Sequence, residues 1–105
     1  MKVLCICQEG NNRSVTIASR IKYLGHDVLS AGLNTNSRET LNQLYEWADR
    51  ILTTNVNQYV PNRFEGKTRL WDIGPDIYPR PFNRALLQIV NDLIAEFRHD
   101  LTPDP

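Results

Sequence analysis

Four short segments with β-strand character alternate along this 105-residue chain with segments whose apolar residues recur at helical spacing. The first, Val3 to Ile6, is continuously apolar, as expected of a parallel strand that is buried on both faces of a sheet. The others are predicted over residues 26–30, 50–53 and 67–71. This alternation predicts an α/β fold in which helices cover both faces of a small parallel sheet. Ligands are then expected at the carboxyl ends of the strands.

Three longer segments predict helices. The first helix begins near Arg13 and ends before Gly25, a residue that suits the left-handed conformation at a helix C-terminus. Ser37 is a suitable N-cap for the second helix. The third helix has a wide apolar stripe from Leu86 to Phe97. A shorter helical piece is expected around residues 56–60.

The chain is expected to form one domain over residues 1–101, followed by a frayed tail over residues 102–105. The segment 72–81 contains three prolines and a glycine, which predicts a loop after the fourth strand. No internal repeat or linker indicates a second domain. The domain is large enough to bury a core without a disulfide or a metal ion.

Composition narrows the classes of partner. Twelve basic and twelve acidic residues cancel, so no net charge favours nucleic acid or an anionic membrane. No segment reaches the length of a membrane span, and the first residues lack the order of a signal peptide. Cys5 and Cys7 lie two positions apart on one strand, where a disulfide between them is geometrically unfavourable. We therefore expect a cytoplasmic protein with free thiols, no nucleic-acid partner and no membrane partner.

The strongest functional signal is the eight-residue segment CQEGNNRS, from Cys7 to Ser14. Five residues separate its cysteine from its arginine, and the segment connects the first predicted strand to the first predicted helix. A loop of this length can wrap backbone N–H groups around a tetrahedral oxyanion, with the thiolate of Cys7 below the anion and the guanidinium of Arg13 beside it. Its position at a strand end predicts a phosphate-binding loop.

Each residue type in this loop suits phosphate-ester cleavage. A free cysteine has a pKa of roughly 8.5, and a helix N-terminus and a nearby guanidinium favour its thiolate. Arg13 can hold two phosphoryl oxygens with its planar guanidinium, best in the transition state. Ser14 can donate a hydrogen bond to the sulfur, while Gly10 and Asn11 tolerate the dihedral angles of a tight curl. The predicted phosphate-binding residues are Gln8, Glu9, Gly10, Asn11, Asn12 and Arg13.

The segment Cys7 to Ser14, together with Ser30-Ala31-Gly32, resembles the low-molecular-weight protein tyrosine phosphatase family. Residues Trp47 to Leu52 resemble that family's junction between a helix and the third strand. Residues Asp72 to Tyr78 resemble the late loop of its short bacterial-type members. The resemblance implies a flavodoxin-like three-layer sandwich with a four-stranded parallel sheet in the order 2-1-3-4. It also implies a phosphocysteine intermediate, with neither a metal ion nor an organic cofactor.

The loop departs from the family pattern at two positions. The pair Gly10-Asn11 stands one position later than usual, behind Glu9. A carboxylate is unfavourable in a phosphate loop unless its side chain points to solvent, so Glu9 leaves both a working loop and a degraded or specialised one open. Asn12 replaces the cysteine that commonly precedes the arginine, so a disulfide within the loop cannot form.

Phosphate-ester cleavage also needs a proton donor for the leaving group and a base for water. Asp76 is the first candidate, because it lies in the proline-containing loop and resembles the family's acid in a Pro-Asp-x-Tyr setting. Asp72 is the second candidate; either aspartate could instead be a turn-forming residue. Tyr78 either stacks against an aromatic leaving group or packs in the protein. His26 and His99 lack a further ligand at suitable spacing, so no metal site is predicted.

These observations predict a cysteine-dependent phosphomonoester hydrolase, by resemblance a protein tyrosine phosphatase. Its substrate would be a phosphotyrosine protein or a small aryl phosphate, with inorganic phosphate as product and inhibitor. One alternative is a module that binds phosphate or a phosphoprotein without turnover. Arsenate reduction normally needs later cysteines, which this sequence lacks, and a phosphocysteine carrier is disfavoured by Arg13. The sequence indicates neither the natural substrate nor the oligomeric state.

Overall fold

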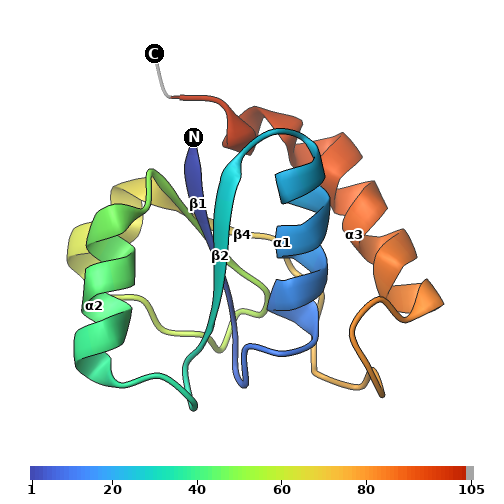
Figure 1. The fold of residues 1–105 in the computed structure, drawn as a ribbon, viewed down its shortest axis with the longest axis horizontal. Coiled ribbons are helices and arrows are strands. Elements are labelled where there is room, and N and C mark those ends of the chain that lie inside the picture. The colour runs from blue at the N-terminus through green and yellow to red at the C-terminus, as the bar shows by residue number, and fades with distance from the viewer. Residues whose placement is uncertain (104–105) are drawn as a thin grey trace.

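Four parallel strands in the order β2-β1-β3-β4 form the centre of the fold in the computed structural model, which describes residues 1–103 (Figure 1). The strands are β1 (Lys2–Cys7), β2 (Asp27–Gly32), β3 (Arg50–Thr53) and β4 (Thr68–Leu70). The helices within this range are α1 (Arg13–Tyr23), α2 (Arg38–Trp47) and α3 (Arg84–Phe97), with the 3-10 helices η1 (Asn62–Lys67) and η2 (Arg98–Leu101). The α/β class and the strand order expected from the sequence are therefore confirmed.

Helices cover both faces of the sheet, with α1 and α3 on one side and α2 and η1 on the other (Figure 1). Successive side chains of a strand point to opposite faces, so β1 supplies both layers. Val3 and Cys5 pack in the layer of α1 and α3, whereas Leu4 and Ile6 pack in the layer of α2. The first layer also buries Ile17, Ile21, Leu52, Trp71, Leu86 and Val90, and the second buries Leu41, Tyr45, Ile51 and Phe64.

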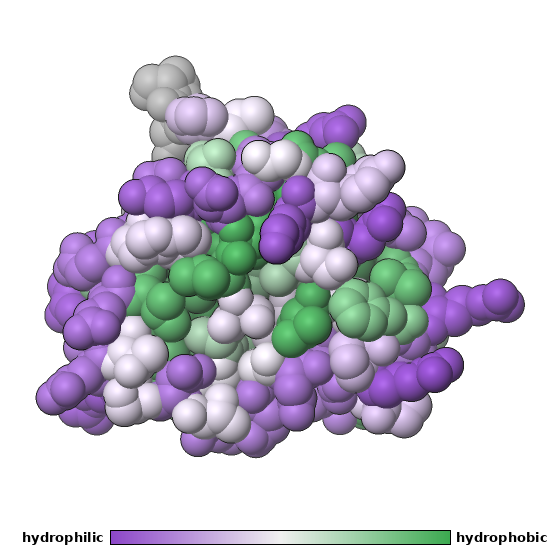
Figure 2. All heavy atoms as spheres, in the orientation of Figure 1, coloured by the Kyte–Doolittle hydropathy of each residue, from purple (hydrophilic) through white to green (hydrophobic). Residues whose placement is uncertain are grey.

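β2 is an edge strand, and its middle lies at the surface. Figure 2 shows hydrophobic side chains gathered over β2 between α2 and α1, while polar side chains cover most of the surrounding face. Leu29 is 44% exposed there. The two carboxyl-terminal residues of β2, Ala31 and Gly32, are buried. Strand β2 is therefore best enclosed at the end that lies beside the Cys7–Ser14 loop.

Among residues 1–103, no helix has the length and apolar character needed to cross a membrane.

Two local expectations between β3 and β4 are wrong. No helix forms over residues 56–60, because the side chain of Gln58 accepts a hydrogen bond from Thr54 N–H at 2.7 Å and donates one to Thr54 Oγ1 at 2.8 Å. These bonds turn the chain without a helical backbone pattern. A 3-10 helix forms instead over Asn62–Lys67, where a turn was predicted, and β4 has only three residues.

The C-terminal segment is attached near the amino ends of the strands, at the end of the sheet opposite the Cys7–Ser14 loop. The buried Arg50 donates through Nε to the Asp100 carbonyl at 2.8 Å and through Nη2 to the Thr102 carbonyl at 3.2 Å. Trp71 Nε1 donates to Asp100 Oδ2 at 2.9 Å. Thr102 is thus held by hydrogen bonds, while residues 104–105 of the expected tail lie outside the described residues. The candidate site lies at the other end of the sheet, at the carboxyl ends of the strands.

Candidate active site

The Cys7–Ser14 segment is anchored at both ends by regular structure. Cys7 is the last residue of β1, and Arg13 and Ser14 begin α1, as the sequence predicted for the start of this helix. All three side chains are buried. The connection lies at the lower edge of the molecule in Figure 1, at the carboxyl ends of the strands. A cysteine, an arginine and a serine are therefore fixed by a strand and a helix rather than by a flexible loop.

The sulfur of Cys7 is close to two hydrogen-bond donors. The backbone N–H of Gly10 donates to it at 3.1 Å, and the hydroxyl oxygen of Ser14 lies 3.1 Å away. The hydroxyl can donate to a thiolate, which has no proton of its own. A backbone amide and a hydroxyl on one sulfur form a setting that stabilises negative charge there.

Gly10 makes this geometry possible. Its φ angle is +77°, and an added Cβ would lie 2.6 Å from the Gly32 nitrogen and 2.9 Å from the Ala31 carbonyl carbon. Gly32 is equally constrained, since its own Cβ would lie 2.4 Å from the Glu9 carbonyl carbon. The loop and the end of β2 therefore touch backbone to backbone. This contact gives a physical reason for a glycine in the Ser30-Ala31-Gly32 segment.

The loop offers further unpaired donors. Among residues 1–103, the backbone N–H groups of Gln8, Glu9, Asn11 and Asn12 have no hydrogen-bond acceptor. Helix α1 follows immediately, and no side chain caps its N-terminus. The first N–H groups of a helix have no acceptor within the helix, and they carry the positive end of its dipole. A row of free N–H donors beside a cysteine is a suitable environment for an oxyanion.

Arg13 is held in place by one main-chain contact. Its Nη1 donates to the Gly74 carbonyl at 2.6 Å, and the residue is only 2% exposed. Its buried Nε has no hydrogen-bond partner within the described residues. A buried guanidinium with an unsatisfied donor is costly unless it binds an anion. Arg13 therefore supplies both orientation and positive charge at the loop.

Glu9 does not face the sulfur. Its side chain is exposed, and Oε1 accepts a hydrogen bond from Asn34 Nδ2 at 3.0 Å. The Thr35 hydroxyl donates to the Glu9 carbonyl at 3.0 Å, and Asn34 N–H donates to the Gln8 carbonyl at 2.8 Å. The turn after β2 therefore holds the carboxylate away from the loop centre, which is the orientation that a phosphate loop can tolerate.

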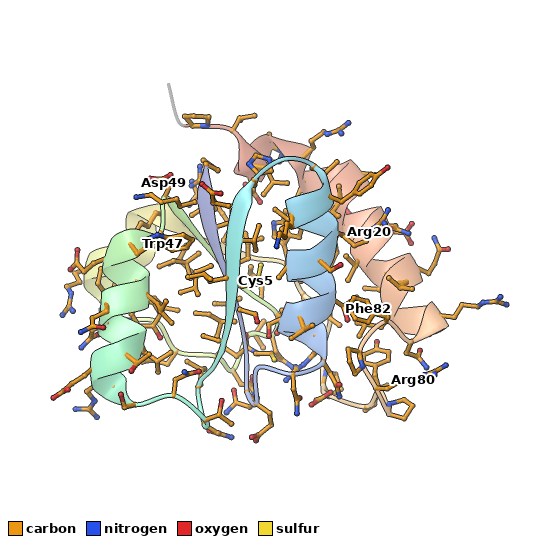
Figure 3. All side chains as sticks on the ribbon, in the orientation of Figure 1. Cys5, Arg20, Trp47, Asp49, Arg80 and Phe82 are labelled. Carbon is orange, nitrogen blue, oxygen red and sulfur yellow. The ribbon has the colours of Figure 1, made fainter. Side chains whose placement is uncertain are left out.

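The segment 72–82 lies across the start of α1. Besides the Arg13–Gly74 bond, Asn12 Nδ2 donates to the Tyr78 carbonyl at 3.0 Å, and Phe82 N–H donates to Thr16 Oγ1 at 3.1 Å. Figure 3 shows Arg80 and Phe82 on this segment, beside the N-terminal end of α1. The segment is thus attached to the Cys7–Ser14 loop by two of its main-chain carbonyls, and to the first turn of α1 by one amide.

The two candidate aspartates have different surroundings. Asp76 is exposed, and its Oδ1 lies 3.4 Å from Asn12 Nδ2. Asp72 Oδ1 accepts a hydrogen bond from Gly74 N–H at 2.9 Å, which stabilises a local turn. The structure therefore brings Asp76, and not Asp72, into contact with the phosphate-loop candidate.

Aromatic and sulfur side chains near the site belong to the core. Tyr78 is half-buried and packs against the cluster that contains Trp71 and Leu86. Cys5 lies one layer deeper than Cys7, in the interior between the sheet and α1 (Figure 3). Burial, reinforced by the nearby Cys7, raises the pKa of the Cys5 thiol, so this group stays protonated. Both cysteines are free.

Some contributors to the site have no signature in the sequence. Gly74 acts through its carbonyl, and the Thr54 carbonyl holds it by accepting hydrogen bonds from Ile73 and Gly74 N–H at 2.8 and 3.3 Å. Asn34, which binds Glu9, was also not predicted. A residue that acts through its main chain can be of almost any type, so composition and spacing do not reveal it. Among residues 1–103, no group of three His, Cys, Asp or Glu side chains is placed to hold a metal ion.

No protein-family model matches the sequence, and no curated protein sequence matches it. Solved structures do match the fold. A YwlE arginine phosphatase from Geobacillus stearothermophilus has a TM-score of 0.61 and 16% identity, covering 94% of each chain. A YwlE mutant from Bacillus subtilis has a TM-score of 0.52 and 20% identity, covering 96% of this chain and 95% of the other.

A thioredoxin-dependent arsenate reductase from Corynebacterium glutamicum is also similar, with a TM-score of 0.56 and 18% identity. The match covers 93% of this chain and 58% of the reductase. The shared architecture is a parallel sheet in the order β2-β1-β3-β4 between two helical layers. This chain therefore has the α/β fold of these solved structures, which is the fold that the resemblance noted in the sequence implied.

Proposed function

We propose that this protein is a cysteine-dependent phosphatase that cleaves phosphomonoesters through a phosphocysteine on Cys7. The observation that carries the proposal is the approach of Gly10 N–H and the Ser14 hydroxyl to the Cys7 sulfur, each at 3.1 Å, inside a loop with free N–H donors. Thiolates are strong nucleophiles, and these donors stabilise the anion. The likeness to phosphatases of the same fold supports the class.

In the proposed first step, Cys7 Sγ attacks phosphorus and forms a P–S bond. The P–O bond to the leaving group breaks, and its electron pair goes to the leaving oxygen. The protonated carboxyl of Asp76 gives its proton to this oxygen. Arg13 and the loop N–H groups bind the other phosphoryl oxygens most strongly in the transition state, where negative charge is redistributed over them.

In the second step, a water molecule attacks the phosphorus of the phosphocysteine, and the Asp76 carboxylate takes a proton from that water. The P–S bond breaks, and inorganic phosphate leaves. The electron pair of this bond returns to Cys7 as the thiolate. A hydrogen bond from Ser14 stabilises the departing sulfur, which makes the serine useful mainly in this step.

Aromatic phosphates are the proposed substrates. The segment that carries Asp76 also exposes Ile77 and Phe82, which are 73% and 46% exposed. These apolar side chains, with the half-buried Tyr78, can pack against an aromatic leaving group such as that of phosphotyrosine. Phosphotyrosine proteins or small aryl phosphates would be substrates, and inorganic phosphate a product and inhibitor. Free thiols are compatible with a reducing compartment, so we also propose a cytoplasmic location.

The test compares turnover of 4-nitrophenyl phosphate and phenyl phosphate between pH ~5 and 7, with a chelator present. We expect Cys7→Ser to remove activity. Asp76→Asn should slow phenyl phosphate far more than 4-nitrophenyl phosphate, since nitrophenolate leaves without a proton. Asp72→Asn is the matched control, because its amide oxygen can still accept from Gly74 N–H. Phosphoarginine is a third substrate to include, given the Geobacillus neighbour.

Rapid quenching of Asp76→Asn during turnover should trap phosphate on Cys7, detectable by mass spectrometry. Phosphate binding by wild-type protein without hydrolysis of any of the three substrates would contradict the proposal. That result would favour a module that binds a phosphorylated ligand without turnover.

A further inference from the structure

A second concave site lies on the other side of the sheet from α1. It is a groove of about 700 Å³ between α2 and the segment that leads into η1. We call it the α2 groove. It is lined by Leu33, Asn36, Arg38, Leu41, Asn42, Tyr45, Tyr59, Pro61 and Arg63. This volume falls in the range of sites that bind small molecules or short peptide segments.

The floor of the α2 groove contains a tyrosine hydroxyl that is open to solvent. Tyr45 is 3% exposed, and its ring packs against Phe64 with centroids 5.2 Å apart. Within the described residues its hydroxyl has no hydrogen-bond partner. Burial, together with the neighbouring Tyr59, raises the pKa of Tyr45, so the hydroxyl keeps its proton and can donate.

The walls of the α2 groove are positively charged. Arg38 lies on α2 and Arg63 on η1, and both are exposed. Neither forms an ion pair within the described residues, although the Arg63 guanidinium lies 4.6 Å from the Phe64 ring centroid. No Asp or Glu among residues 1–103 lines the groove. Two free guanidiniums and a phenol around an apolar floor are complementary to an anion on an organic chain.

One turn lies between the α2 groove and the candidate active site. The end of the groove is formed by the turn at residues 33–36, and this turn also supports the phosphate loop. Leu33 N–H donates to the Cys7 carbonyl at 3.0 Å, and Asn34 N–H donates to the Gln8 carbonyl at 2.8 Å. One face of this short turn therefore contacts the loop that would hold phosphate, while its other residues border the groove.

We propose that the α2 groove binds an acidic segment of the phosphoprotein substrate, through carboxylates that pair with Arg38 and Arg63. This inference rests on the proposed function and names the kind of substrate. Leu33 contacts the Cys7 carbonyl and Arg38 follows it by five residues, so their backbones are at most ~18 Å apart, because an extended residue covers at most ~3.6 Å. A segment of about four or five residues can therefore reach from the phosphorylated residue at Cys7 to the groove.

The exposed carboxylate of Glu9 adds a second condition to the substrate sequence that we expect the protein to prefer. It lies on the phosphate loop and accepts a hydrogen bond from Asn34, which belongs to the turn that borders the groove. It disfavours an acidic residue directly next to the phosphorylated one by like-charge repulsion. The arginines favour acidic residues farther away, so the preferred substrate has neutral neighbours and acids four or five positions distant.

The experiment uses two phosphotyrosyl peptides. One has glutamates four and five residues from the phosphotyrosine on both sides, and the other has glutamines at the same positions. We expect wild-type kcat/KM to be about fivefold higher for the acidic peptide, the size expected of two exposed ion pairs, and the ratio to fall at high salt. The double variant Arg38→Gln, Arg63→Gln should bring the ratio close to one.

Arg98→Gln is the matched control, because Arg98 is an exposed arginine on η2 at the opposite edge of the sheet. It should keep the wild-type ratio. Hydrolysis of 4-nitrophenyl phosphate is measured with every protein, since this substrate is too small to reach the groove. Equal kcat/KM for the two peptides in wild-type protein, or a preference that survives in the double variant, would overturn the inference.

A binding measurement separates this inference from the proposed function. Fluorescence anisotropy of the labelled peptides with the Cys7→Ser variant should show tighter binding of the acidic peptide, lost when Arg38 and Arg63 are also replaced. If no protein hydrolyses any aryl phosphate, the proposed enzyme activity fails while this binding difference can still be observed. Equal binding of both peptides would reject the groove as an acidic-segment site, whatever the activity.

Discussion

Asn12 Nδ2 donates a hydrogen bond to the Tyr78 carbonyl at 3.0 Å and lies 3.4 Å from Asp76 Oδ1. These contacts join residues that are more than sixty positions apart in the chain. Asn12 occupies the position at which the resembling family commonly has a second cysteine. In this chain that position connects the phosphate-loop candidate to the segment that carries the candidate acid.

Asn12→Ala should therefore weaken proton donation more than substrate binding. Without the amide, the segment 74–78 keeps the Arg13–Gly74 bond but loses the contacts of Asn12 with Asp76 and Tyr78, so Asp76 is less often near the leaving oxygen. We expect kcat for phenyl phosphate to fall about tenfold, with a smaller change for 4-nitrophenyl phosphate. Steady-state kinetics with both substrates measure this difference.

Asn91→Ala is the control for the Asn12 variant, because Asn91 is an exposed asparagine on α3 that accepts only from Arg20 Nε at 3.2 Å. It should leave both rates unchanged. Equal slowing of the two substrates by Asn12→Ala would show that Asn12 does not act through the acid.

The backbone contact between the phosphate loop and β2 gives a second prediction. Gly10→Ala places a Cβ 2.6 Å from the Gly32 nitrogen, on a residue with φ of +77°. We expect the free energy of unfolding to fall by about 2 kcal/mol or more and the N–H contact with Cys7 to be disturbed. Denaturant unfolding measures the first effect, and aryl phosphate turnover measures the second.

Gly66→Ala is the matched control, since an added Cβ at Gly66 meets no atom within 4 Å. Its free energy of unfolding should stay within about 1 kcal/mol of the wild-type value, on the stabilising side if it changes. If Gly10→Ala were as stable and active as Gly66→Ala, the close approach of the loop to β2 would have no energetic importance.

The sequence predicted the parts of the fold that depend on local chemistry. The apolar run at β1 defined a strand buried on both faces, and Ser37 does cap α2, accepting from Thr40 N–H at 3.1 Å. The Cys7–Ser14 loop also lies where the alternation of strands and helices placed it. The spacing of apolar residues and the presence of a capping residue are local properties, so they can be recognised in a single sequence.

Contacts that depend on where particular side chains meet were not predictable in the same way. The helix expected over residues 56–60 is absent because Gln58 folds back on Thr54, a preference that apolar spacing does not report. The choice between Asp72 and Asp76 depended on which carboxylate meets Asn12. Arg38 and Arg63 both line the α2 groove. They come together only because α2 packs beside η1, which the spacing of residues in the sequence does not show.

The buried Cys5 thiol gives a prediction about stability at alkaline pH. Burial raises the pKa of Cys5 above its ordinary value of 9.0, so above that pH the unfolded chain releases the proton while the folded chain keeps it. The unfolded state then binds fewer protons, and the free energy of unfolding must decrease as pH rises. Well below pH 9, where both states keep the proton, this contribution is constant.

Cys5→Ala isolates this effect from other groups that titrate at high pH. The stability difference between wild type and the variant should be constant up to about pH 8.5 and then shrink by up to ~1.4 kcal/mol per pH unit. Urea unfolding from pH 7.5 to 10.5 measures it. A difference that stays constant over the whole range would show that Cys5 ionises equally in both states.

The contact between Arg13 and Gly74 leads to the last prediction. The Gly74 carbonyl accepts from Nη1 at 2.6 Å, which leaves Nε and the second terminal nitrogen of the guanidinium for an oxyanion. Arg13→Lys keeps the positive charge but has only one nitrogen, which cannot both hold Gly74 and bind two phosphoryl oxygens. We expect kcat for 4-nitrophenyl phosphate to fall about 10²- to 10³-fold, as when a transition-state donor is removed. Arg20→Lys, on the same helix, should retain wild-type turnover, and an active Arg13→Lys enzyme would contradict a paired-oxygen role for the guanidinium.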